Sequence, residues 1–141
     1  MAHPVSVRFR NPELVDRLKT EARARDESTS ALAEELIDEG LRVRRHPLIT
    51  FRPGPTGRRA ALVGGPDVWE LIAGTVGGDV PVEERRARAV EVFGLRPEQI
   101  DAALTYYAEF RDEIDQRIED NRAAAEEAEA LWRRRQDLLA T

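Results

Sequence analysis

The sequence predicts a mainly α-helical protein with a small amount of β structure. Three observations favour this class. Apolar and polar residues alternate over residues 5–10, apolar residues recur at helical spacing over much of the chain, and neither glycine nor proline occurs from residue 98 onward. The expected order is a strand and two helices, then a β-hairpin and a helix-turn-helix-like domain that ends in a long C-terminal helix.

The first predicted domain, residues 1–45, begins with a strand that has no partner inside the segment. Val5, Val7 and Phe9 alternate with polar residues, which is the pattern of a strand with one buried and one solvated face. Because a single strand needs hydrogen bonds from another strand, we expect two chains to pair here as an intertwined dimer.

Two amphipathic helices are predicted after this strand. Asn11 and Pro12 signal the start of the first helix, and Ser28 is expected to cap the second. Each helix carries one apolar stripe, formed by Leu14, Val15, Leu18 and Ala22 in the first and by Leu32, Ala33, Leu36, Ile37, Gly40 and Leu41 in the second.

This order resembles the ribbon-helix-helix family of bacterial repressors and antitoxins (the Arc, MetJ and CopG type) over about the first third of the chain. The resemblance implies that the paired strands enter the major groove of operator DNA, where outward side chains read the bases. The residues in those positions are Ser6, Arg8 and Arg10. It also sets the amino end of the second helix against a DNA phosphate, at Ser28, Thr29 and Ser30.

The charge of this segment departs from the family pattern. Residues 1–45 contain nine basic and nine acidic residues, so DNA binding requires that the charges be segregated. The strand carries only arginines, and the acidic cluster lies in the second helix at Glu34, Glu35, Asp38 and Glu39. We therefore expect modest DNA affinity from one dimer, and a strand with a helical hairpin in some other small core remains the alternative.

The second predicted domain spans residues 46–118, because Pro47 ends the preceding helix. Two short apolar runs around residues 48–51 and 60–63 flank the turn-rich "RPGPTGR" and predict a β-hairpin. Asp67 is expected to cap a helix that buries Val68, Trp69, Leu71 and Ile72. Further on, Gly94 ends one helix and Pro97 begins the next, which predicts a helix-turn-helix shape.

This domain resembles a widespread bacterial domain of unknown function found in antitoxins of PIN-like nuclease toxins (VapB type). The shared markers are Gly57-Arg58, Val68-Trp69 and Ala103-Leu104-Thr105-Tyr106-Tyr107. Trp69 and Tyr107 are expected in the core, since large aromatic side chains chiefly anchor packing. Acidic residues on the second helix of the pair disfavour DNA contact there.

Residues 119–141 are predicted to be a helical tail. If one helix ran from residue 98 to the end, it would be roughly 60 Å long and would outreach the domain. The tail is either a solvated helix or an arm that wraps the toxin with apolar side chains in a groove and an arginine at the carboxylates of a PIN-type active site. The expected toxin-binding residues are Leu131, Trp132, Arg133, Arg134, Arg135 and Leu138.

The composition disfavours catalysis. The chain has no cysteine and two histidines, and it contains no phosphate-cradling loop or paired metal-ligand motif. We therefore expect no enzymatic activity, no catalytic residue, no metal and no cofactor. No apolar run reaches membrane length and no signal peptide is recognised, so a cytoplasmic protein without membrane contact is expected.

Together these features predict a type II antitoxin that binds operator DNA as a homodimer and neutralises a PIN-like ribonuclease toxin, with higher oligomers on DNA or with toxin. One alternative is a ribbon-helix-helix repressor without a toxin, in which the second domain handles oligomerisation or a small effector. Another is a dimeric adaptor that does not bind DNA.

Overall fold

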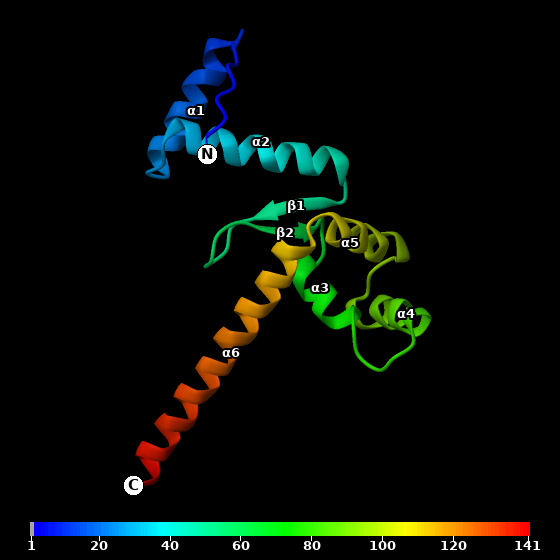
Figure 1. Cartoon of the computed structure of the whole chain (residues 1–141). Coiled ribbons are helices and arrows are strands. Elements are labelled where there is room, and N and C mark those ends of the chain that lie inside the picture. Colours follow the sequence, from blue (N-terminus) through cyan, green and yellow to red (C-terminus); the bar gives the residue numbers. More distant parts are fainter. Residues whose placement is uncertain (1) are drawn as a thin grey trace. The chain divides into compact units, whose positions relative to one another are not determined.

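The computed structural model describes residues 2–141 (Figure 1). These residues form six helices and one two-stranded sheet, so the fold is mainly α-helical with a small β component, as predicted. The chain divides into two compact units, which we call unit 1, ending at Arg44, and unit 2, from Arg45 to Thr141. This division lies one residue before the predicted one.

Unit 1 is built on helices α1 (Pro12–Ala24) and α2 (Thr29–Arg45). The Asn11 side chain accepts a hydrogen bond of 2.9 Å from the backbone N–H two residues further on. Ser28 Oγ accepts one of 3.0 Å from the backbone N–H of Ala31. Both side chains satisfy N–H groups that lack partners at a helix start, and both predicted helix starts are confirmed.

Residues 2–9 form no regular secondary structure in the single chain, in contrast to the predicted strand. Val5, Val7 and Phe9 are all exposed. The predicted strand needs backbone hydrogen bonds from the same strand of a second chain, and a single chain does not provide them. The ribbon therefore stays a prediction.

Unit 2 begins with the predicted β-hairpin, which is confirmed. Strand β1 (Ile49–Arg52) pairs antiparallel with β2 (Arg59–Leu62), and Ile49 lies opposite Leu62. Both of these residues are fully buried, so the inner face of the hairpin forms one wall of the core.

Three short helices follow the hairpin: α3 (Val68–Thr75), α4 (Val82–Phe93) and α5 (Pro97–Glu109). Gly94 ends α4 with a left-handed φ of 64°, a conformation that glycine adopts without a steric penalty. The predicted pair of helices joined by a short turn is confirmed.

The predicted long C-terminal helix is present, but the single helix from residue 98 onward that the sequence allowed is divided in two. Helix α5 ends at Glu109 and is followed by Phe110, whose φ and ψ are −118° and 42°, and α6 (Arg111–Ala140) starts directly after it. The Phe110 ring lies 4.7 Å from the ring of Tyr106 and 6.1 Å from that of His46. This break without glycine or proline coincides with aromatic packing, which a pattern of helix-breaking residues does not reveal.

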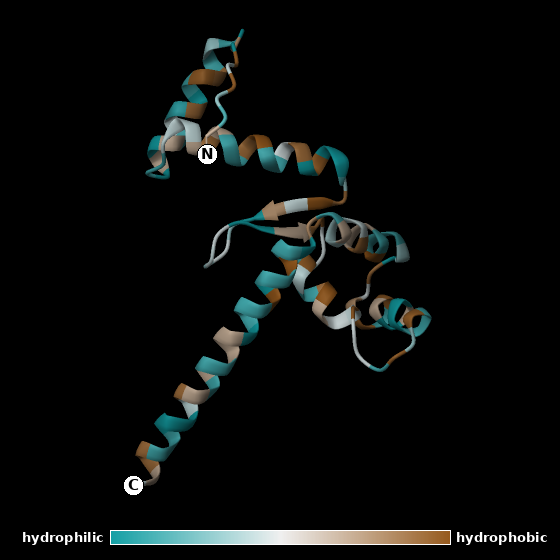
Figure 2. Cartoon of the chain, in the orientation of Figure 1, coloured by the Kyte–Doolittle hydropathy of each residue, from teal (hydrophilic) through white to brown (hydrophobic). Residues whose placement is uncertain are grey.

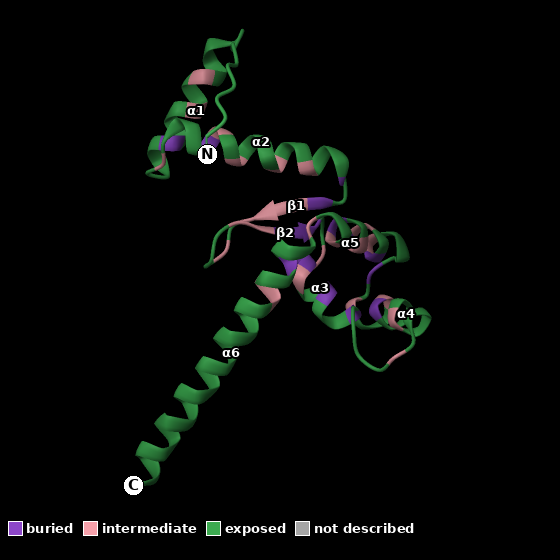
Figure 3. Cartoon of the chain, viewed as in Figure 1, coloured by how far each residue is buried: buried purple, intermediate pink, exposed green. Residues whose placement is uncertain are grey.

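Helix α3 occupies the centre of unit 2 and contacts β2, α4, α5 and α6. Figure 3 shows that the buried residues of this unit lie in the hairpin, in the short helices and at the start of α6. The core comprises Ile49, Ala60, Leu62, Val68, Leu71, Ile72, Ala89, Leu95, Ile100, Ala103, Tyr106 and Ile114.

Candidate DNA-binding and partner-binding surfaces

The predicted base-reading residues lie on the exposed N-terminal arm. Ser6, Arg8 and Arg10 are exposed, and within residues 2–141 neither arginine takes part in an ion pair or hydrogen bond. Both guanidinium groups are therefore free to contact an external acceptor.

Unit 1 leaves most of its apolar side chains in solvent. Among its described residues, the only buried apolar ones are Ala22 and Leu32. Figure 2 shows apolar bands along α2, where Leu36, Ile37 and Leu41 are more than half exposed. The full exposed set is Val5, Val7, Phe9, Leu14, Leu36, Ile37, Leu41 and Val43. A unit with so small a core is incomplete as a single chain.

The amino end of α2 has the features of an anion site. Ser28 provides the cap, Thr29 and Ser30 are exposed, and the first turn contains no acidic residue. The free N–H groups and the helix dipole there favour negative charge. Glu27 immediately precedes the cap and opposes this effect with its own charge.

Helix α6 is docked by its first two turns only. Ile114 is buried and Ile118 packs against the core of unit 2, whereas every residue from 119 to 141 is exposed (Figure 3). At about 1.5 Å per residue, the 30 residues of α6 make a helix roughly 45 Å long, most of which has no protein neighbour.

The predicted toxin-binding residues all lie on this exposed part of α6. Leu131, Trp132 and Leu138 are 55%, 58% and 77% exposed. Arg133 pairs with Glu129 at 2.6 Å, while Arg134 and Arg135 have no partner among the described residues. The helix therefore presents apolar side chains together with two unpaired cations.

Pairs of opposite charge stabilise α6 along its length. Arg122 bonds both Glu119 and Glu126, each at 2.5 Å, and its hydrogen bond holds the pKa of Glu119 below the ordinary value. Such exposed pairs contribute little individually, but their three- and four-residue spacing favours the helical state without tertiary contacts.

Trp69 and Tyr107 both pack against the core, yet each remains half-buried. The indole N–H of Trp69 donates to Asp67 at 3.2 Å. The Tyr107 hydroxyl donates to Asp115 at 2.6 Å, which raises the pKa of the phenol. Each aromatic side chain thus packs against the core and also donates a hydrogen bond through its polar group.

Asp67 differs from its predicted role. It stands at the start of α3, but its side chain makes no capping hydrogen bond. The buried carboxylate instead pairs with Arg59 and lies 3.9 Å from Arg52. Leaving a buried carboxylate without an opposite charge costs more free energy than leaving a backbone N–H at a helix start without a cap. The Asp67 side chain therefore pairs with the arginines of the hairpin instead of capping α3.

Sequence reasoning missed a second charged cluster, built around the buried His46 at the start of unit 2. His46 Nε2 lies 2.7 Å from Glu109 Oε2, and Arg45 Nε lies 3.0 Å from the same oxygen. The His46 ring packs edge-on against the fully buried Tyr106 at 5.1 Å. The only signal in the sequence was the position of His46 beside Pro47.

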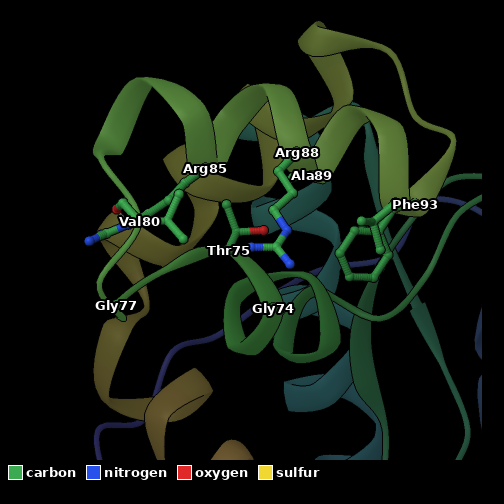
Figure 4. Close-up of a pocket in the computed structure, with 9 residues that line it drawn as sticks. Gly74, Thr75, Gly77, Val80, Arg85, Arg88, Ala89 and Phe93 are labelled. Atoms are coloured by element: carbon green, nitrogen blue, oxygen red, sulfur yellow. Dashed lines mark hydrogen bonds between the residues drawn. The ribbon is translucent and has the colours of Figure 1, made fainter.

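A pocket of about 380 Å³ lies between α3 and α4 and was also missed (Figure 4). Its walls include Thr75, Arg88 and Phe93. Residues 2–141 contain no group of three histidine, cysteine or acidic residues placed to hold a metal ion. Over the same residues, no helix has the length and apolar character needed to cross a lipid bilayer.

No known family model, curated protein or solved structure matches the chain. The functional argument therefore rests on the surfaces described above.

Proposed function

We propose that the chain is a type II antitoxin that binds operator DNA as a dimer through unit 1 and neutralises a PIN-like ribonuclease through unit 2. The observation that carries this proposal is the presence of two separate sets of exposed apolar side chains, one in unit 1 and one on α6. Two sets on different units suit two different partners.

For unit 1 the proposed partner is a second copy of the chain. Pairing of two N-terminal arms would supply the missing strand hydrogen bonds and would bury Val7 and Phe9 against Leu36 and Ile37. Arg8 and Arg10 alternate with these apolar residues, so they would face outward from the ribbon. Arginine pairs well with guanine edges in the major groove.

For α6 the proposed partner is the nuclease. An amphipathic helix binds a protein groove through apolar residues that recur on one face. Leu131 and Leu138 are seven residues apart, which is about two turns, and Trp132 lies next to Leu131 in the sequence. Arg134 and Arg135 are unpaired and suit the carboxylates of a metal-dependent nuclease site.

A repressor without a toxin is the second candidate, favoured by the pocket between α3 and α4, which a small effector could occupy. The product of the gene directly downstream discriminates between the two. A small nuclease with an acidic site supports the antitoxin, whereas an unrelated metabolic operon supports the repressor.

The experiment combines the chain with that downstream product and uses two variants. Truncation after Glu119 should lower affinity for the nuclease by orders of magnitude and leave binding to the DNA upstream of the operon unchanged. Replacement of both Arg8 and Arg10 by alanine should abolish the gel shift and leave nuclease inhibition unchanged, since bidentate contacts to guanine contribute roughly 1–3 kcal/mol each.

Inhibition at full affinity by the truncated chain would refute the arm. If the wild-type chain is a folded dimer but gives no gel shift, the alternative of a dimeric adaptor that does not bind DNA is favoured.

A further inference from the structure

We propose that the pocket between α3 and α4 binds a small carboxylate with an apolar body. This site lies within unit 2 and uses neither the N-terminal arm nor the exposed part of α6. It is therefore independent of the antitoxin function proposed above.

The cation of the site is Arg88 on α4. Its side chain extends from α4 toward α3 and toward Thr75 (Figure 4). Within residues 2–141 no carboxylate pairs with Arg88 and no acceptor hydrogen-bonds it. The planar guanidinium offers two parallel N–H groups, which is the geometry that a carboxylate accepts.

The second polar group is the hydroxyl of Thr75, at the last position of α3. Thr75 is 7% exposed, and its Oγ1 is buried without a hydrogen-bond partner in the described part of the chain. A buried hydroxyl without a partner is costly, and this one lines the pocket. A ligand oxygen placed between Thr75 and Arg88 would satisfy the hydroxyl.

The remaining wall is apolar. Val80, Ala89 and Phe93 line the pocket, and the absence of a side chain at Gly74 allows the Phe93 ring to lie against α3. A Cβ added at Gly74 would sit 3.1 Å from Phe93 Cζ, closer than ordinary packing permits. This wall suits an aliphatic or aromatic group.

Arg85 fixes the loop that closes the other side of the pocket. Its Nη2 donates to the carbonyl of Gly78 at 2.7 Å, and its Nε donates to the carbonyl of Val80. Gly77 and Gly78 both adopt a left-handed φ, of 88° and 85°, which few other residues would tolerate. The loop is thus attached to α4 by a second arginine, whose N–H groups are partly occupied.

One free guanidinium and one hydroxyl favour a monoanion over a phosphate. A phosphate dianion presents more acceptor oxygens than these two groups can satisfy. Some of its oxygens would then face the apolar side chains of Val80, Ala89 and Phe93. The volume of about 380 Å³ is at the lower end of ligand pockets, which fits a molecule the size of benzoate.

The test is an NMR titration of the full-length chain with benzoate, with its neutral isostere benzamide and with inorganic phosphate. We expect saturable shifts of the backbone amides of residues 74–80 and 88–93 with benzoate, and much weaker effects with the other two probes. Arg88→Gln and Thr75→Val should each weaken benzoate binding about tenfold or more. Arg44→Gln, at an exposed position of α2, removes the same charge and should leave benzoate binding unchanged.

Arg88 is exposed and Thr75→Val conserves volume, so both variants should remain folded, as their melting curves would verify. The proposal is overturned if benzoate gives no saturable shift, if benzamide binds as tightly as benzoate, or if both variants bind benzoate like the wild type.

Discussion

Unit 1 and unit 2 differ in how much apolar surface each buries within one chain. Among the described residues, unit 1 buries two apolar side chains, whereas unit 2 buries thirteen, including the large Tyr106. Because buried apolar surface is the main source of folding free energy, unit 2 has a core of its own and unit 1 does not. Under the proposed function, this difference means that unit 1 folds together with a second copy of the chain, whereas unit 2 folds on its own.

The largest expected effect comes from a charge at Phe9. In the single chain this residue is 46% exposed, so Phe9→Asp should be harmless unless a second chain covers it. We expect a monomer with a largely unfolded unit 1, because the dimer would otherwise bury an unpaired ion. Light scattering and circular dichroism measure the two effects.

Val82→Asp is the matched control, since Val82 is also exposed and an acidic residue suits the first turn of α4. A Phe9→Asp protein that remained a stable dimer would refute the intertwined unit 1.

Tyr106→Ala probes the other side of the comparison. Tyr106 is fully buried in the core of unit 2, so its truncation should cost about 3–5 kcal/mol of unfolding free energy, as for other large aromatic residues. In urea denaturation, unit 2 of this variant should unfold at a lower urea concentration than in the wild type, while the proposed dimer of unit 1 persists. Tyr107→Ala, at a half-buried neighbour, should cost less, and an equal cost would contradict the position of the core.

A smaller effect is expected at the turn between α1 and α2. Asp26 adopts a left-handed φ of 55°, and the N–H of the next residue bonds back to Ala22 at 2.9 Å. Glycine is preferred at this helix-ending position, so Asp26→Gly should stabilise unit 1 by about 0.5–1 kcal/mol. Asp16→Gly, inside α1, should instead destabilise it by ~0.3 kcal/mol; stabilisation by both would indicate another cause.

The smallest effect concerns Tyr107 at high pH. The hydrogen bond to Asp115 raises the pKa of this phenol above its ordinary value of 10.0. A raised pKa in the folded state means that the stabilisation is complete below pH 10.0 and is lost as the pH rises through the folded pKa. The stability difference between the wild type and Tyr107→Phe should therefore shrink above pH 10.0, as measured by urea midpoints, and a constant difference would contradict the bond.

Features with local signals were predicted well from the sequence. Asn11, Ser28, Gly94 and Pro97 mark helix ends in the sequence and in the structure, because capping and backbone conformation depend on neighbouring residues. The hairpin followed from its turn-rich segment in the same way.

Features that depend on distant residues were not predicted. The break at Phe110 coincides with packing on His46 and Tyr106, and the carboxylate of Asp67 turns to Arg59 across the hairpin. The pocket required α3 and α4 to be brought together. The predicted DNA-binding and toxin-binding residues lie on exposed surfaces, and the roles proposed for them require partners that a single chain does not contain.

The most direct test of the account is the molar mass in solution of the full chain and of residues 46–141. The account predicts that the 15.9 kDa chain is a dimer at micromolar concentration and that the fragment is a folded monomer, because unit 1 alone lacks a complete core. A monomeric full chain with a folded unit 1, or a fragment that dimerises as tightly as the full chain, would contradict it.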